Sequence, residues 1–439
     1  MKFFDREKEI KTLKEINEKS KSNAQFTVLT GRRRIGKTSL VFKAYDGLDF
    51  LYFFVSKKSE SELCNDYKNE IENKLKILIP GKITKFYVLF EYLMQLSLTR
   101  HLIIFIDEFQ EFLHVNPSVY SDMQRIWDVN KNSAHLNLIV CGSVNSLINR
   151  IFRDLKEPLY ARQTAFLKIE GFETGVLKNI LLEYNSGYDN EDLLAFYALT
   201  GGVAKYAELL VDNNALTKDK MLDYVLQSES VFLSEGKNLL IEEFGKDYGT
   251  YFTILSHIAS GVNSRPAIET EIAKEIGGYI SRLENDYGII AKKQPLFEKS
   301  PNKNVRYFIK DNFLNFWFRF IFKYNFMLEI NAHDRLKEII RRDWEVYSGF
   351  ALEKYFTARL IEEQRFTRIG QWWDRKGENE IDVIAADELS KTAEFYEVKR
   401  QKSRINIEVL KDKAGAFNKA TGGFKKFDEK FFALSLEDM

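Results

Sequence analysis

The sequence has few of the residues that mark several common classes of protein. Two cysteines, Cys64 and Cys141, in 439 residues exclude a disulfide framework and a thiolate metal cluster. The five histidines form no set with metal-ligand spacing. Proline is scarce, with 6 residues, and no low-complexity linker or internal repeat is present. We therefore expect domains that are joined by short connections, in a reducing cytoplasm.

The chain also lacks an excess of charge and long apolar runs. Its formal net charge is +1, so a nucleic-acid site would have to be a local patch. Runs such as HLIIFI and FLNFWFRFIF are too short to span a bilayer, and MKFFDREKEI has no apolar signal core. We expect a cytoplasmic protein with no membrane partner. A chain of 439 residues is too long for one hydrophobic core and predicts several domains.

What the sequence does contain is a phosphate-binding motif near its start. QFTVL, at 25–29, predicts a buried strand, and GKTSLVFKAY predicts the helix that follows. Glycines let the intervening backbone curl around phosphate oxygens, and the helix N-terminus adds partial positive charge. Lys37 can reach the β- and γ-phosphates, and Thr38 can ligate Mg²⁺. The expected nucleotide-binding residues are Gly31, Arg32, Arg33, Arg34, Ile35, Gly36, Lys37, Thr38 and Ser39.

Two alternatives stay open at this motif. The glycines can form an ordinary turn before a surface helix. The three arginines, 32–34, are either a solvated basic loop or a means of neutralising the nucleotide or a neighbouring subunit.

Acidic residues follow a second strand-like run. Residues 102–106 are continuously apolar, as in a strand that is buried on both faces. Asp107 can then hold Mg²⁺ through water, and Glu108 can orient and deprotonate an attacking water. The alternative is an acidic cap on the next helix. Hydrolysis as well as binding of a nucleotide is the prediction.

Further polar residues follow the later strands. Ser143 comes after the apolar run 136–140, where it can contact the γ-phosphate or simply cap a core strand. Arg162, in PLYARQTA, either reaches a nucleotide as an arginine finger or pairs with a surface carboxylate. Segments 48–56 and 165–172 complete five strands separated by helices, which predicts a parallel α/β sheet.

The chain resembles a known family at these residues. FFDREKEI, GRRRIGKTSL, LIIFIDEFQ, LIVCGSV, PLYAR and TGGVAKY together are similar to the archaeal-type ATPases, which are related to the AAA+ and STAND ATPases. The resemblance implies an ATP and Mg²⁺ site and a strand order in which the Ser143 strand separates the other two motif strands. It also implies a winged helix-turn-helix and a C-terminal domain with the restriction-endonuclease-like fold. The Gly201-Gly202 break before a helix either closes over the nucleotide as a lid or is a helix–helix turn. Val144 and Ala161 depart from the family pattern beside Ser143 and Arg162.

The middle of the chain predicts three helices and a β-hairpin, which is the pattern of a winged helix-turn-helix. The helix around 278–283 can enter a DNA groove. The cations that could meet phosphate are Arg282, Lys292, Lys293, Lys303 and Arg306. Against this, such domains can pack only on the nucleotide domain, and Glu284 and Asp286 would repel phosphate.

A second acidic constellation lies near the C-terminus. Glu397 and Lys399 share one strand face, and Asp382 lies in a preceding strand. Carboxylates of this kind can hold a divalent metal while a lysine orients water against a phosphodiester. The family resemblance adds Glu353 as a ligand and Gln401 as a further residue. The alternative is a surface hairpin with paired charges, or a retained fold used for protein contact.

These expectations combine into one architecture and two functions. The predicted domains are an ATPase core (1–180), a helical lid (181–243), a winged helix (244–330) and a restriction-endonuclease-like domain (331–439). The first function is a Mg²⁺-dependent ATPase whose nucleotide state controls engagement, and cleavage, of double-stranded DNA. The second is a regulatory ATPase switch whose C-terminal parts bind protein, or a second copy of the chain, without nuclease activity.

Overall fold

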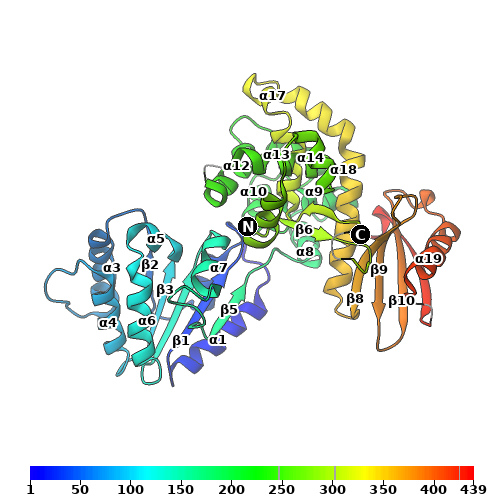
Figure 1. Ribbon diagram of the computed structural model, residues 1–439. Coiled ribbons are helices and arrows are strands. Elements are labelled where there is room, and N and C mark those ends of the chain that lie inside the picture. The colour runs from blue at the N-terminus through cyan, green and yellow to red at the C-terminus, as the bar shows by residue number, and fades with distance from the viewer. Residues whose placement is uncertain (246–247, 301–302, 425) are drawn as a thin grey trace. The chain divides into compact units, whose positions relative to one another are not determined.

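The computed structural model describes residues 1–245, 248–300, 303–424 and 426–439. The chain forms two compact units. Residues 5–170 make one unit, and residues 1–4 with 171–439 make the other (Figure 1). The four domain boundaries expected from the sequence stay a prediction, since this division is coarser.

The unit of residues 5–170 is built on a five-stranded sheet. All its strand pairs are parallel, and the strand order is β2-β3-β4-β1-β5. The predicted parallel sheet is confirmed, with β4 between β3 and β1. The strands are β1 (Gln25–Thr30), β2 (Leu51–Phe54), β3 (Leu102–Asp107), β4 (Leu136–Cys141) and β5 (Ala165–Lys168). Both β3 and β4 are buried at every residue, which is why their sequences are mostly apolar without alternation, with Asp107 and Asn137 as buried polar exceptions.

Helices cover this sheet. Helices α1 (Glu7–Ser20) and α2 (Lys37–Ala44) pack against each other. Helix α1 also contacts β1 and β4. The main hydrophobic core joins β1–β4 to a second group of helices. That group is α3 (Glu60–Leu75), α4 (Phe86–Leu96), α6 (Ser118–Asn130) and α7 (Asn145–Arg153), with the short α5 (Phe112–Val115) before α6.

The second unit begins with helices. They are α8 (Thr174–Tyr184), α9 (Asn190–Thr200), α10 (Ala204–Asp212), α11 (Lys218–Val225) and α12 (Val231–Phe244). The central helix is α9, which is buried at every residue from Asp192 to Thr200 and contacts α8, α10 and α11. A capping box between Asp189 and Asp192 fixes its start, because each side chain accepts a backbone N–H of the other residue.

Three helices and a two-stranded sheet follow, in the order that the sequence predicts. They are α13 (Tyr248–Ala259), α14 (Arg265–Ile272), α15 (Gly277–Ser281), β6 (Ile290–Lys293) and β7 (Arg306–Ile309). A π-helical turn, Arg282–Asp286, extends α15, and β6 pairs with β7 in antiparallel fashion. The winged-helix assignment itself stays a prediction. Two short helices, α16 (Asn312–Phe316) and α17 (Asn325–Glu329), lead on to the C-terminal part.

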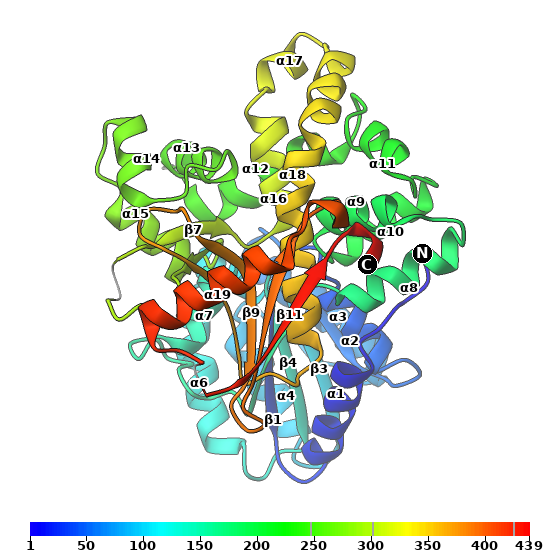
Figure 2. The ribbon, with the colours of Figure 1, turned by 90° about the vertical axis from the view of Figure 1, so that its right-hand side faces the viewer.

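The C-terminal part combines one long helix with a mixed four-stranded sheet. The helix α18 (His333–Glu362) precedes a sheet in the order β11-β10-β9-β8, in which only the β10–β11 pair is parallel. The strands are β8 (Arg368–Trp373), β9 (Glu380–Asp387), β10 (Thr392–Val398) and β11 (Asp428–Leu434). Helix α19 (Ile407–Thr421) lies along the sheet and packs on β9, β10 and β11 (Figure 2). Among the described residues, no helix has both the length and the apolar character needed to cross a bilayer.

Candidate functional site

The loop between β1 and α2 depends on two glycines. Gly31 has φ +146°, and a Cβ there would lie 2.5 Å from the backbone oxygen of Ile169. Gly36 has φ +97° and caps α2 in a left-handed conformation. Residues with a side chain rarely adopt either backbone conformation, so glycine is required for the loop to fold over the start of the helix.

Lys37 points back into this loop. Its ammonium donates to the backbone oxygens of Gly31, at 3.0 Å, and Arg32, at 3.2 Å. Burial lowers the pKa of Lys37, and the nearby Cys141, Glu108 and Asp107 act in the opposite direction. The buried cation is therefore held where a phosphate could replace the carbonyl oxygens as its partner.

Asp107, the last residue of β3, lies beside the start of α2. Its Oδ2 accepts from Thr38 Oγ1 at 2.7 Å and from the Tyr52 hydroxyl at 3.3 Å. Its Oδ1 accepts from the Glu108 N–H at 2.9 Å and from Cys141 Sγ at 2.7 Å. These four donors fix the carboxylate next to the Thr38 hydroxyl. The carboxylate and hydroxyl oxygens are hard ligands of the kind that Mg²⁺ prefers.

Glu108 is held by the turn after β4. Its Oε2 accepts from Ser143 Oγ at 2.7 Å, from the Ser143 N–H at 3.3 Å and from Gln110 Nε2 at 2.6 Å. The strand order brings this about, because β4 is next to β3 and their carboxyl ends share one edge of the sheet. The structure thus brings Glu108 and Ser143 together, beside Lys37, Thr38 and Asp107.

The remaining residues predicted for the cradle differ in burial. Ile35 is buried beneath the loop, Ser39 is exposed on α2, and Arg32, Arg33 and Arg34 are half-buried. The loop residue Arg34 has a positive φ of 66°, which helps to reverse the chain before Gly36.

Arg162 is not brought to the cradle. Its Nε and Nη2 donate to Asp128 Oδ2 at 3.4 and 3.2 Å, and its Nη1 donates to the backbone oxygen of Tyr160. Thr27 pairs with Ala165 in the parallel sheet, so Arg162 lies at the amino-terminal edge, whereas the cradle lies at the carboxyl-terminal edge. The chain therefore forms the surface ion pair in this structure, and nucleotide contact by Arg162 stays a prediction.

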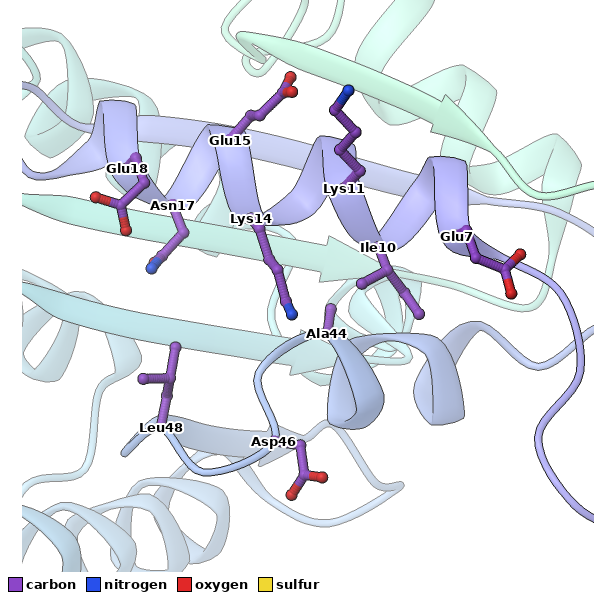
Figure 3. Close-up of a pocket in the computed structure, with 10 residues that line it drawn as sticks. All are labelled: Glu7, Ile10, Lys11, Lys14, Glu15, Asn17, Glu18, Ala44, Asp46 and Leu48. Carbon is purple, nitrogen blue, oxygen red and sulfur yellow. The ribbon is translucent and has the colours of Figure 1, made fainter.

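A surface hollow of about 670 Å³ lies between α1 and the connection from α2 to β2 (Figure 3). The side chains of Ile10, Lys14 and Asn17 extend from α1 toward this connection, while Lys11 and Glu15 extend away from it. Its lining mixes both signs of charge and includes none of the residues predicted for the site. We assign it no role.

The C-terminal constellation comes together on β9, β10 and α19. Lys399 Nζ lies 3.0 Å from Asp382 Oδ2 and 3.1 Å from Glu397 Oε1. A lysine that the sequence did not indicate, Lys413 on α19, donates to both oxygens of Glu397 at 3.1 and 2.9 Å. The N–H of Val398 also donates to Asp382, at 2.7 Å. Both carboxylates are buried and paired with ammonium groups.

Glu353 on α18 is an electrostatic neighbour of Asp382 and Lys399. Burial and the neighbouring Asp382 raise the pKa of Glu353 to about 8. Burial and Glu397 raise the pKa of Asp382, against the pull of Lys399. Gln401 is exposed after β10. In the described part of the chain, no three carboxylate, histidine or cysteine side chains form a ready-made metal cluster. Asp382 and Glu397 offer oxygen ligands, but a metal there would have to displace lysines.

The two-stranded β6–β7 sheet contacts the C-terminal sheet. Lys293 Nζ lies 3.1 Å from Gln371 Oε1, and Arg306 Nη1 lies 2.8 Å from Glu380 Oε1. The Arg306 guanidinium also lies 4.2 Å from the ring centre of Trp373. Lys293 and Arg306, both expected to meet DNA phosphate, therefore have protein partners in this structure. Phosphate contact stays a prediction for all five cations.

Four residues at these sites carried no sequence signal for their position. Tyr52 is one aromatic residue in an aromatic strand, and Gln110 follows an acidic pair without a fixed spacing. Lys413 lies on a helix with several lysines, and Gln371 lies on an edge strand. Tertiary contacts alone select them. Lys413 is a partial exception, because it lies three residues after the buried Leu410 and four before the buried Phe417, which places it on the helix face toward the sheet.

Comparisons with known proteins match two segments of the chain to family models. Residues 3–210 match the model of a family described as an ATPase domain predominantly from Archaea. Residues 317–410 match a model described as archaeal and bacterial proteins of unknown function. An uncharacterized protein of Methanocaldococcus jannaschii is 32% identical over 407 residues, which cover 90% of this chain and 87% of the relative.

A second, shorter protein of that organism is 34% identical over 101 residues, which cover 21% of this chain and 98% of the relative. Among solved structures, the Walker-type ATPase of Pyrococcus abyssi matches with a TM-score of 0.55 at 20% identity. The match covers 72% of this chain and 96% of that one. At this identity the likeness shows a shared fold.

Proposed function

Because the chain belongs to the family of ATPases found predominantly in Archaea, we propose that it hydrolyses ATP with Mg²⁺ at the β1–α2 cradle and that the bound nucleotide controls its C-terminal part. The observation that carries the proposal is the convergence of Lys37, Thr38, Asp107 and Glu108 at one edge of the parallel sheet. ATP binding and the ATPase class follow from the family. The residue roles and the control of the C-terminal part are the proposal.

Each residue of the cradle has a defined task in this proposal. The loop N–H groups and Lys37 bind the phosphates, because a buried ammonium interacts strongly with an anion that replaces its carbonyl partners. Thr38 and Asp107 would hold Mg²⁺, since their oxygens are 2.7 Å apart and of the hard type that this ion prefers. When bound, Mg²⁺ neutralises charge on the β- and γ-phosphates.

Glu108 would accept a proton from the attacking water. In this structure its Oε2 accepts hydrogen bonds from Ser143 and Gln110. One of these hydrogen bonds has to give way before a water can bind at that oxygen. Ser143 and Gln110 are therefore candidates for residues that couple phosphate binding to the position of the base.

The test of the cradle uses two variants and a matched control. Lys37→Ala and Glu108→Gln should each lower ATP hydrolysis by at least 100-fold, since charge stabilisation and general-base catalysis each supply factors of this order. Lys43→Ala changes another lysine of α2 that pairs only loosely with Asp46, at 3.8 Å, and should hydrolyse ATP normally. Full hydrolysis by Lys37→Ala would contradict the assignment.

The finer part of the proposal is that nucleotide state controls engagement of DNA, and its cleavage, at Asp382, Glu397 and Lys399. Paired carboxylates beside a lysine support phosphodiester chemistry, in which the ammonium orients water or stabilises charge. The experiment is cleavage of supercoiled plasmid and single-stranded DNA with Mg²⁺ or Mn²⁺, with and without ATP. Nicking that is lost in Asp382→Ala and Lys399→Ala supports it.

A second candidate function is the regulatory switch without nuclease activity. It is favoured by the contacts of Lys293 and Arg306, which hold β6–β7 on the C-terminal sheet and away from phosphate. In this case the C-terminal part binds protein, or a second copy of the chain. Three results together would favour the switch: ATP hydrolysis stays intact, DNA is not cleaved under any of these conditions, and the protein shows no salt-sensitive binding to DNA.

A further inference from the structure

Strand β2 forms one edge of the five-stranded parallel sheet. It pairs with β3, and no other strand of the described chain lies on its outer side. The Val55 N–H donates to the Asp107 oxygen on the β3 side at 3.0 Å. Since backbone direction alternates along a strand, the N–H and C=O groups of Tyr52 and Phe54 point outward. The Tyr67 hydroxyl donates to the Phe54 oxygen at 3.0 Å, which leaves that oxygen one further acceptor site.

A row of aromatic side chains accompanies this edge. Every second residue, at 51, 53 and 55, belongs to the main hydrophobic core. The opposite face carries Phe50, Tyr52 and Phe54. Phe42 of α2 packs there, with its ring centre 5.2 Å from those of Phe50 and Tyr52. Phe42 and Phe54 nevertheless stay 44% and 48% exposed, and an exposed aromatic surface of this kind is typical of a binding interface.

The residues that flank this row carry opposite charges. Asp49 lies before the aromatic row and Lys57 after it, and both are exposed. Within the described part of the chain neither forms an ion pair, whereas the adjacent Lys58 pairs with Asp66 at 2.7 Å. We call residues 49–57 the edge segment. Its negative start and positive end make it complementary in charge to an antiparallel copy of itself.

We propose that the edge segment pairs with the same segment of a second copy of this chain, in antiparallel fashion, to form a symmetric dimer. A two-fold axis beside Phe53 sets the register, because it places Asp49 of each copy opposite Lys57 of the other. Any other register moves these charges past one another. The partner is therefore a second copy, since one surface supplies both halves of the complementarity.

The same register suits the backbone and the rings. Tyr52 of one copy lies opposite Phe54 of the other, and their outward N–H and C=O groups face each other as in a hydrogen-bonded antiparallel pair. Their side chains share one face, where aromatic cross-strand pairs stabilise a sheet. The two five-stranded sheets become one continuous sheet. Because the edge segment is short, we expect a weak dimer that forms at micromolar concentration.

The first test measures self-association of the full chain without nucleotide or DNA, so its outcome does not depend on the proposed function. Sedimentation velocity over a roughly hundredfold range of concentration should show a monomer–dimer equilibrium. Phe54→Lys should raise the dissociation constant by at least roughly tenfold, because it places a charge in the aromatic contact. Val129→Lys, at a residue of α6 that is 77% exposed, is the matched control and should dimerise normally.

Two results of this test would overturn the proposal. One is a chain that stays monomeric over the whole range of concentration. The other is a dimer that Phe54→Lys does not weaken, since such a dimer uses another surface.

The second test examines the register through charge exchange. Asp49→Lys and Lys57→Asp should each raise the dissociation constant by roughly three- to tenfold at low salt, because two ion pairs become two repulsions. The double variant should recover most of the affinity, since opposite charges again face each other. A double variant as weak as the single ones would contradict the register. Tighter association of Lys57→Asp would show that this lysine protects the edge from pairing, and would also overturn the proposal.

Discussion

At the scale of single residues, the cradle follows its sequence motif closely. Gly31, Gly36 and Lys37 were all indicated by spacing, because a phosphate loop needs fixed backbone conformations at fixed positions. The partners of Asp107 and Glu108 could not be predicted in the same way. Tyr52 reaches Asp107 from the neighbouring strand β2, and Gln110 reaches Glu108 from a short turn, so only the folded chain brings them there.

Gly31→Ala should damage the cradle through its backbone. The added Cβ would meet the Ile169 oxygen, and an L side chain at φ +146° is strained, so we expect ATP affinity to fall more than tenfold. Binding of a fluorescent ATP analogue and the melting temperature measure the effect. Gly47→Ala is the matched control, because its φ of +79° carries similar strain with open space around the Cβ. Equal losses of affinity in both variants would contradict the steric explanation.

Arg162→Ala should change little in the isolated chain. Its side chain is paired with Asp128 at the edge of the sheet opposite the cradle, and exposed pairs contribute about 0–1 kcal/mol. We expect unchanged ATP affinity and a melting temperature within about 2 °C of the natural chain. Arg150→Ala, which removes another surface pair, with Glu157, serves as the control. A loss of ATP affinity specific to Arg162→Ala at low protein concentration would show that the residue does reach the nucleotide.

At the scale of elements, the apolar runs predicted the parallel strands. The signal was clearest at β3 and β4, because strands buried on both faces have little alternation. The contact between β6–β7 and β8 was not predictable. Its polar pairs, Lys293 with Gln371 and Arg306 with Glu380, join residues more than 70 positions apart and follow no spacing rule. The sequence alone did not distinguish the cations of β6 and β7 that pair with protein groups from those that could bind DNA phosphate.

The packing of α1, α2 and β4 around Tyr45 predicts a dependence on alkaline pH. The buried hydroxyl donates to the Leu13 oxygen and accepts from Asn137, and burial raises the pKa of Tyr45 to about 12. The protonated form is favoured in the folded state. Its contribution to stability is therefore complete below pH 10 and is lost as the pH rises through 12.

Tyr45→Phe should accordingly flatten the decline of stability between pH 10 and 12. Denaturant unfolding at several pH values measures this decline. Tyr184→Phe, on α8 in the other unit, is the control and should keep the natural pH dependence. An unchanged slope in Tyr45→Phe would contradict the role given to this hydroxyl.

At the scale of the whole molecule, the net charge of +1 gives no general attraction for DNA, so retention has to depend on local cations. Arg306 is already engaged by Glu380 and Trp373, whereas Lys303 is exposed in the β6–β7 connection. We expect Arg306→Ala to lower the melting temperature and to leave DNA retention unchanged. We expect Lys303→Ala to weaken DNA retention and to leave the melting temperature unchanged. Filter binding across a range of salt concentrations, beside thermal unfolding, distinguishes the two.

The Leu296 N–H donates to the backbone oxygen of Gln371 on β8, a bond that bears on how the C-terminal domain can be studied. It covers part of β8, an edge strand whose unpaired backbone groups could otherwise template pairing with another chain. A fragment cut at residue 331 would lose this cover together with Phe297, and would expose part of its core. Such a fragment should self-associate, whereas one that begins before β6 should stay dispersed. A soluble C-terminal fragment therefore has to begin before β6, upstream of the boundary at residue 331 that the sequence motifs suggest.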